Sequence, residues 1–253
     1  MSDRAYQQLA ARLDELPNGF PKTGNGAELR LLKKLYSPQE ASLASKLRLN
    51  LETADQIAAR LANHDLVSDP GSLKQTLKGM ARKGLIKAGK LDHGVGFGLL
   101  PFVVGIYEMQ LGRIDKELAQ LFEDYYLQAF GEALNEEPKF HRVVPVKETI
   151  AVNMEVHPYE SASEIVNQSR AWGVMDCICR KQKALLGEPC DHPLEMCMVF
   201  SPVAGAFDHS DTIRALSQEQ ALETLHKAAQ AGLVHTVSNT RAGNHYICNC
   251  CTC

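Results

Sequence analysis

Apolar side chains recur at helical spacing through most of the first hundred residues, and turn or capping residues separate the runs. A strand beginning at Gly84 and a glycine-rich, apolar segment near 94–104 are predicted to form a hairpin. Helices are predicted near residues 27–36, 38–47, 53–64 and 72–83. The last three helices followed by a hairpin have the order of a winged helix-turn-helix.

Capping-box patterns support these helix starts, because a Ser or Thr precedes a Glu or Gln by three residues. The pairs are Ser37–Glu40, Thr53–Gln56, Ser72–Gln75, Ser161–Glu164 and Ser217–Gln220. Pro38 adds the proline that helices favour at their first position.

Helical spacing continues through residues 105–135 and predicts one long helix, which Pro138 ends. We therefore place a domain boundary near residue 137 and expect an α+β, helix-rich chain. Residues 1–137 are predicted to form a winged-helix-like helical domain, and residues 138–253 a cysteine-rich α/β metal-binding domain. In the second domain the predicted elements are strands at 142–146, 173–178 and 196–200, helices at 161–171 and 217–231, and a hairpin at 233–248.

One internal similarity links the two parts of the chain. Residues 73–86 and 221–234 share leucine, alanine and glycine at matching positions, with Gly84 corresponding to Gly232. The leading interpretation is two unrelated helices that each end at a glycine before a strand. The alternative is a second winged-helix-like unit whose hairpin carries Cys248.

The composition is that of an ordinary globular protein, with 45% hydrophobic and 23% charged residues and a net charge of −3. Such a charge creates no global field that attracts nucleic acid or membrane. The longest apolar run, Gly94–Tyr107, contains glycines and a proline and is too short to span a bilayer. The N-terminus lacks the apolar segment of a secretory signal, so we expect a cytoplasmic protein.

All eight cysteines lie between Cys177 and Cys253, in two tight groups. In a reducing cytosol, clustered cysteines favour metal ligation or redox chemistry over structural disulfides. A thiolate is a soft ligand, which points to a thiophilic metal centre. The candidate metal ligands are Cys177, Cys179, Cys190 and Cys197 in the first group and Cys248, Cys250, Cys251 and Cys253 in the second.

The first group has enough thiolates to hold one [4Fe–4S] cluster. Arg180 and Lys181 follow its first two cysteines and are candidate cofactor-binding cations, because they offset the negative charge of a ligated cluster. The second group is too cramped for four corners of one cubane, and the side chains of Cys250 and Cys251 tend to diverge. These cysteines are expected to serve two clusters, to join the first group, or to form a site completed beyond Cys253, since we expect the natural chain to continue.

Zinc held by four thiolates is the main alternative, although zinc sites favour C-x2–4-C spacings. Cysteines without metal and a catalytic thiol relay are weaker alternatives. His192, His209 and His245 lie near the cysteine segments, and surface or hydrogen-bonding roles are the leading interpretation for them. A ligand role for His192 or His245 is the alternative.

The segments CICRKQKALLGEPCDHPLEMC (177–197) and HYICNCCTC (245–253) resemble a family of prokaryotic [4Fe–4S] ferredoxin-type proteins. The resemblance spans most of the chain and implies a winged-helix-like region followed by a cysteine-rich part that transfers electrons. Members of the family usually continue into a ferredoxin domain with C-x-x-C-x-x-C-x-x-x-C-P motifs, which this sequence does not contain.

Our leading hypothesis is an iron–sulfur electron-transfer protein with one or two [4Fe–4S] clusters, a component or partner of a larger anaerobic redox system. It is an electron-transfer subunit of an oxidoreductase rather than a stand-alone catalyst, because no nucleotide-binding loop or metalloprotease motif is present. Redox proteins are the expected partners, with a homo-oligomer also considered.

A second hypothesis is a redox-sensing transcription regulator. Lys74, Lys78 and Arg82 share one face of the last winged-helix helix, where DNA-binding proteins contact the duplex. DNA is a less favoured partner than a redox protein, since the same charges also suit a solvated helix face. A third hypothesis is a zinc-stabilised interaction protein.

Overall fold

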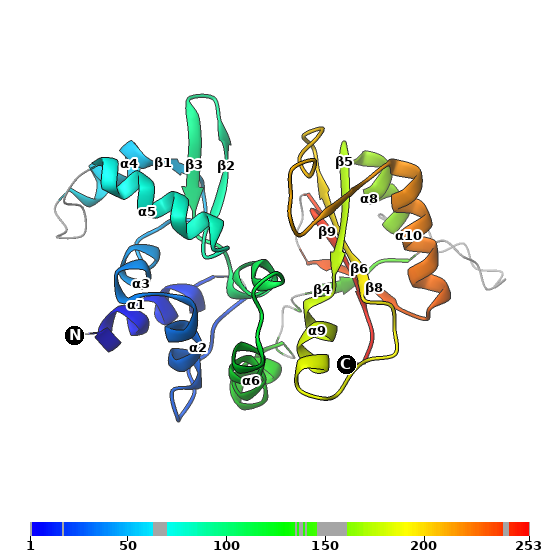
Figure 1. Cartoon of the computed structure of the whole chain (residues 1–253), viewed down its shortest axis with the longest axis horizontal. Helices are drawn as coiled ribbons and strands as arrows, with labels where there is room; N and C mark the ends of the chain where they lie inside the picture. Colours follow the sequence, from blue (N-terminus) through cyan, green and yellow to red (C-terminus); the bar gives the residue numbers. More distant parts are fainter. Residues whose placement is uncertain are drawn as a thin grey trace. The chain divides into compact units, whose positions relative to one another are not determined.

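The computed structural model describes residues 2–16, 18–62, 70–134, 136, 139, 141–145, 161–239 and 243–252. It is an α+β structure of short helices and antiparallel sheets (Figure 1). The chain divides into two compact units, Met1–Glu136 and Glu137–Cys253. Among the described residues, no helix has the length and apolar character needed to cross a membrane.

The first unit combines helices with a small antiparallel sheet. Its strands are β1 (Glu52–Thr53), β2 (Lys87–Leu91) and β3 (Gly94–Gly98), in the order β1-β3-β2. Its helices are α1 (Ser2–Asp14), α2 (Ala27–Leu35), α3 (Pro38–Ala44), α4 (Ala54–Leu61), α5 (Pro70–Arg82), α6 (Lys116–Tyr125) and α7 (Gly131–Ala133). The helices predicted between residues 27 and 83 and the hairpin after Gly84 are therefore confirmed.

Capping boxes explain where α3, α4, α8 (Ala162–Gln168) and α10 (Gln218–Gln230) begin. Ser37, Thr53, Ser161 and Ser217 each accept a hydrogen bond from the backbone N–H three residues later, and the Glu or Gln there bonds back. The predicted box at Ser72 is wrong, because α5 already begins at Pro70 and Ser72 lies inside its first turn.

The single helix predicted over residues 105–135 is also wrong in its first part. Phe102–Ile106 (η1) is an irregular turn, and Glu108–Gln110 (η2) is a short 3-10 turn. The regular helix begins at Lys116, where the Asp115 carboxylate accepts a hydrogen bond from Leu118 N–H. It continues through Tyr126–Phe130 (η3) into α7.

An aromatic cluster forms much of the first unit's core. The rings of Tyr107 and Phe122 stack with centroids 3.8 Å apart, and Tyr125 packs against Phe20 and Phe130. The Tyr125 hydroxyl is buried and has no hydrogen-bond partner among the described residues. No hydrogen bond within the described part of the chain therefore offsets the cost of removing this hydroxyl from water.

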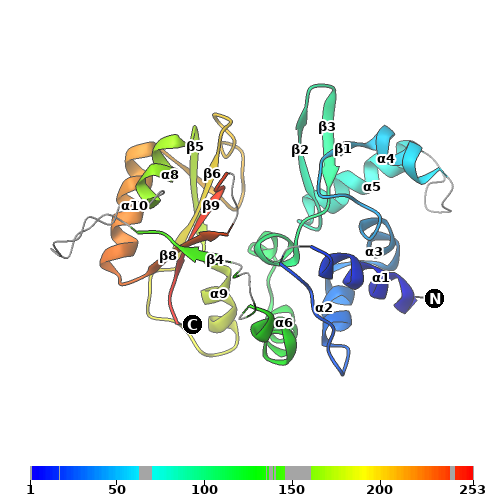
Figure 2. The ribbon, with the colours of Figure 1, turned by 180° about the vertical axis from the view of Figure 1, so that it is seen from behind.

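The second unit is built on one antiparallel sheet with strand order β4-β8-β9-β6-β5-β7. Its strands are β4 (His141–Val143), β5 (Ala171–Asp176), β6 (Glu195–Ser201), β7 (Arg214–Leu216), β8 (Val234–Ser238) and β9 (Tyr246–Cys250). Helices α8 (Ala162–Gln168) and α10 (Gln218–Gln230) cover one face of this sheet, and α9 (Ile178–Leu185) lies toward the other (Figures 1 and 2).

The predicted strands, helices and hairpin of the second unit are all present with shifted ends. The strand predicted at 173–178 starts two residues earlier, at Ala171, and the preceding helix ends at Gln168. Helix α9 was not predicted, because its residues were interpreted as part of a ligand loop. Val146, the predicted end of the first strand, lies outside the described residues.

Strand register decides which side chains of β6 and β9 enter the core. Met198 pairs with Ile247, and both are buried with Phe200 in a cluster that includes Leu225 of α10. Because side chains alternate along a strand, the neighbouring positions point to the opposite face. These are Cys197 on β6 and Cys248 and Cys250 on β9, all partly exposed.

The internal similarity has a structural counterpart. Helix α5 ends before Gly84 and is followed by β2, and α10 ends before Gly232 and is followed by β8. Both glycines have φ of 72°, a left-handed conformation that favours glycine. The second hairpin differs in its surroundings, since β9 also pairs with β6 in the large sheet.

Replacing Tyr125 with Phe removes the buried hydroxyl without changing the ring. We expect Tyr125→Phe to raise the free energy of unfolding by about 0.5–1.5 kcal/mol, measured by urea denaturation, because a buried polar group without a partner is costly. Tyr36→Phe is the matched control: its hydroxyl donates a 2.7 Å hydrogen bond to Leu85 O, so its loss should destabilise by about 1 kcal/mol. A destabilised Tyr125→Phe variant contradicts the prediction.

Candidate metal centre

The turn from β5 into α9 positions the first two cysteines. Cys177 is the N-cap residue of α9, and a β-bulge precedes it at the end of β5. Its N–H donates to Leu194 O at 2.8 Å, and its carbonyl accepts from Lys181 N–H at 3.0 Å. Cys179 follows in the first turn of the helix and is exposed. The strand end and the helix start therefore hold Cys177 firmly from both sides.

The sheet brings three further thiols to the same place. Cys177 is hydrogen-bonded to Cys179 and to Cys197, and Cys248 is hydrogen-bonded to Cys197 and to Cys250. We call Cys177, Cys179, Cys197, Cys248 and Cys250 the sheet-face thiols. They come from α9, β6 and β9, segments that are up to about seventy residues apart in the chain, and adjacent strands bring them together.

Arg180 is a buried cation next to these thiols, with only 2% of its surface exposed. Its guanidinium donates to Pro193 O at 2.7 Å and to Asn249 O at 2.8 Å. Its charge also acts on Cys177 and Cys250. Arg180 therefore ties α9 to the following loop and to β9, and it places a positive charge where thiolates gather.

The contacts among the thiols shift their pKa values in opposite directions. Hydrogen bonds from Cys179 and then Cys197, together with Arg180, hold the pKa of Cys177 far below that of an ordinary thiol, although burial opposes this. The hydrogen bond from Cys248 lowers the pKa of Cys250 to about 7. Hydrogen bonds to Cys197 and Cys250, with burial, raise the pKa of Cys248. The arrangement favours the thiolate, the form that binds metal, at Cys177 and Cys250, and the protonated thiol at Cys248.

Asn249 fixes the direction of the cysteines on either side of it. Its side chain points into the core, where Nδ2 donates to Met196 O at 2.6 Å and Oδ1 lies 2.5 Å from Nδ1 of His235. Since neighbouring side chains on a strand alternate, anchoring Asn249 inward turns Cys248 and Cys250 outward together. Sequence reasoning missed Asn249 and His235; the polar residue between two cysteines of a strand was the available signal.

A row of polar side chains continues the thiol face toward the edge strand. Thr236 Oγ1 lies 3.6 Å from Cys250 Sγ and 3.4 Å from Nδ1 of His141. The other ring nitrogen of His141 lies 2.9 Å from the Tyr246 hydroxyl. Burial lowers the pKa of His141 to about 4, so the ring is neutral at physiological pH.

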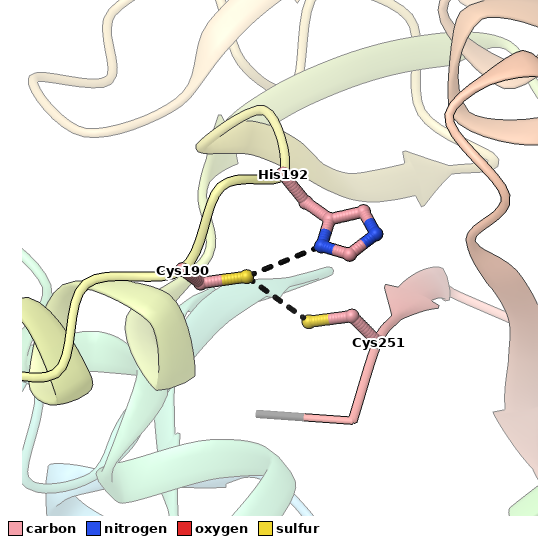
Figure 3. Close-up of side chains that lie close together, drawn as sticks. All are labelled: Cys190, His192 and Cys251. Atoms are coloured by element: carbon pink, nitrogen blue, oxygen red, sulfur yellow. Dashed lines mark hydrogen bonds between the residues drawn. The ribbon is translucent and has the colours of Figure 1, made fainter.

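A second group forms between the loop after α9 and the end of β9. Cys190 Sγ lies 3.3 Å from Nδ1 of His192 and 3.6 Å from Cys251 Sγ (Figure 3). All three are partly buried, and their ligand atoms lie within 4.8 Å of one another. We call Cys190, His192 and Cys251 the loop–tail group; it combines the nitrogen and sulfur donors that many metal sites use.

The predicted ligands therefore form different groups in the structure from those that their order in the sequence suggests. Cys190 was grouped with Cys177, Cys179 and Cys197, but it contacts Cys251. Cys250 and Cys251 diverge as predicted: Cys250 is among the sheet-face thiols, whereas Cys251 packs against core residues that include Met196 and Leu233. Cys253 lies outside the described residues.

The remaining candidate residues fall in separate places. Of the histidines, His192 lies beside two cysteines, His209 is exposed, and His245 lines a cavity of about 310 Å³ with Phe200 and Ile165. Lys181 is partly exposed on α9, next to the buried Arg180. The sequence alone did not distinguish these two cations.

No family model, curated protein or solved structure matches this chain. The resemblance of the cysteine segments to a ferredoxin-type family therefore stays a prediction.

Arg180 and Lys181 offer a paired test of the site. Arg180→Met removes the guanidinium from Pro193 O and Asn249 O and from the neighbouring thiols, so we expect the free energy of unfolding to fall by about 2–5 kcal/mol. Lys181→Met is the matched control and should change it by less than about 0.5 kcal/mol, as surface substitutions do. Equal values for the two variants, measured by urea denaturation, contradict the role assigned to Arg180.

Proposed function

We propose that this protein is an iron–sulfur electron-transfer protein, a component or partner of a larger redox system. The observation that carries the proposal is the convergence of the sheet-face thiols on one side of the β6–β9 pair, beside buried Arg180. Iron–sulfur clusters are held mainly by four cysteine thiolates. The sheet-face thiols exceed this number by one, so they can supply a complete ligand set.

The surroundings of these thiols suit a negatively charged cluster. Four thiolates bring more negative charge than the cluster iron neutralises, and the Arg180 charge offsets part of it. Cys177, Cys197, Cys248 and Cys250 are partly buried, whereas Cys179 is exposed. We therefore assign the four partly buried cysteines as ligands and Cys179 as their exposed neighbour.

The exposure of this face fits electron exchange with a protein partner. A bound cluster would supply one-electron chemistry between a reduced donor and an oxidised acceptor. Cys179 and the outer residues of β8 leave part of the face accessible, so a partner can approach closely. Arg180 raises the reduction potential by stabilising the more negative, reduced form. Four-thiolate ligation suits both [2Fe–2S] and [4Fe–4S] clusters, and the sequence resemblance favours the latter.

Iron and sulfide content tests the proposal directly. Protein purified without oxygen should contain about four iron and four labile sulfide per cluster and show an EPR signal after reduction with dithionite. Cys197→Ser and Cys248→Ser should each lose most of both, because they remove central ligands. Cys251→Ser is the matched control and should keep the iron and sulfide, since Cys251 belongs to the loop–tail group.

Two outcomes would overturn this function. One is zinc in the sheet-face thiols without labile sulfide, which favours the zinc-stabilised interaction protein instead. The other is an unchanged cluster signal in both Cys197→Ser and Cys248→Ser.

A second candidate function, a redox-sensing DNA-binding regulator, is favoured by the surface of α5. The order α3-β1-α4-α5-β2-β3 and the sheet order β1-β3-β2 support a winged helix, in which α5 is the recognition helix. Lys74, Lys78 and Arg82 are exposed on α5, while Leu73, Leu77 and Met80 are buried beneath it. The basic side chains are therefore available to contact phosphates.

DNA binding can be tested with a mixed-sequence duplex at several salt concentrations. If α5 contacts the backbone, Lys74→Glu with Lys78→Glu should weaken binding and reduce the salt slope by about 0.9 for each lost phosphate contact. Lys116→Glu, an exposed lysine on α6, is the control and should leave the slope unchanged. Affinity that is undetectable at low salt, or equal in both variants, removes the regulator from consideration.

A further inference from the structure

We propose that the loop–tail group is a second, mononuclear metal site that binds zinc through Cys190 Sγ, Cys251 Sγ and Nδ1 of His192. The site is separate from the sheet-face thiols and does not depend on the function proposed for them. Cys190 and Cys251 belong to different cysteine groups in the sequence. For His192, the sequence favoured a surface or hydrogen-bonding role.

The distances between the donor atoms suit a single ion. With metal–sulfur bonds of about 2.3 Å and metal–nitrogen bonds of about 2.0 Å, a tetrahedral ion separates its ligand atoms by about 3.5–3.8 Å. The separations here are 3.3 Å for Cys190 Sγ to His192 Nδ1 and 3.6 Å for Cys190 Sγ to Cys251 Sγ. The third separation, between His192 Nδ1 and Cys251 Sγ, is no more than 4.8 Å, so small side-chain movements let one ion contact all three atoms.

The packing of β9 separates this group from the sheet-face thiols. Cys250 contacts Cys248 and Thr236 on the outer face. Cys251 packs instead against a cluster that contains Met196, Ala228 and Leu233. Adjacent cysteines thus serve opposite sides of the strand, and Cys251 is drawn away from the thiols around Cys197.

The donor types select the metal. Two thiols and an imidazole are soft to borderline ligands, which favour zinc over magnesium or calcium, whose ligands are oxygens. Binding displaces the two thiol protons, so two thiolates and a divalent ion leave no net charge in a partly buried site. His192 then carries its proton on Nε2. A tetrahedral ion has one further position, which is filled by water or another donor.

The position of the group suggests what the ion does. Cys190 and His192 lie in the segment between α9 and β6, and Cys251 lies just after β9. An ion at this point joins that segment to the end of β9 and restrains both. Arg180 makes a parallel connection through Pro193 O and Asn249 O, so the metal site reinforces a contact that the protein already makes.

Metal analysis of variants tests the site in the full chain purified without oxygen. The wild-type protein should hold about one zinc per chain in addition to iron and sulfide. Cys190→Ser, His192→Ala and Cys251→Ser should each lower the zinc affinity, measured by competition with a chelator, by about tenfold or more while iron and sulfide remain. His209→Ala, an exposed histidine of the same unit, is the control and should retain the zinc.

Spectroscopy of the wild-type protein tests the site without relying on variants, so poor folding of a variant does not affect the result. X-ray absorption at the zinc edge should show sulfur and nitrogen bonded to the metal, and cobalt exchanged into the site should give the bands of tetrahedral thiolate coordination. Cys197→Ser separates the two sites, because it should lose iron and sulfide but keep zinc.

Three results overturn this inference. They are wild-type protein that binds neither zinc nor cobalt tightly, zinc affinity unchanged in His192→Ala and Cys251→Ser, and zinc lost from Cys197→Ser but kept in Cys190→Ser. The last result places the zinc among the sheet-face thiols. Wild-type protein that holds zinc but no iron or labile sulfide contradicts only the electron-transfer proposal.

Discussion

The alternation of side chains along β6 and β9 is the constraint on which the second unit depends. Pairing Met198 with Ile247 places these two side chains under α8 and α10 and leaves Cys197 and Cys248 on the other face. The hydrophobic effect stabilises this choice, because the reverse arrangement exposes the core residues to water. The apolar residues therefore determine where the thiols lie, and no contact between cysteines is needed to bring them together.

Buried polar residues then refine this arrangement. Arg180 and Asn249 are each almost fully buried and are joined by a hydrogen bond from the guanidinium to the Asn249 carbonyl. Asn249 in turn contacts Met196 O and His235. Buried polar groups are stable only when they are hydrogen-bonded, so this network permits one arrangement of α9, β6 and β9. Rigid neighbours of this kind suit a metal site, whose ligands must be held in place.

The sequence predicted the local elements better than the grouping of the thiols. Helix starts at Ser37, Thr53, Ser161 and Ser217 were predictable because capping is a local interaction. The start of α6 was missed because its cap, Asp115, lacks the Glu or Gln of a capping box. Proximity in sequence grouped Cys190 with Cys197, whereas pairing of β9 with β6 and packing against α10 placed Cys251 beside Cys190. Contacts of this kind depend on tertiary structure, and no local pattern reveals them.

Because Cys250 and Cys251 lie on opposite sides of β9, the pairing register of this strand with β6 cannot shift without displacing them. A slip of one residue against β6 exchanges the faces of every side chain on the strand, so Cys251 moves to the outer face and Cys250 and Asn249 change sides as well. The sheet-face thiols then lose Cys248 and Cys250, the loop–tail group loses Cys251, and the hydrogen bonds of Asn249 to Met196 O and His235 are broken. Only one register of β9 against β6 completes both groups. A sheet that forms with β9 out of register therefore cannot assemble the metal ligands.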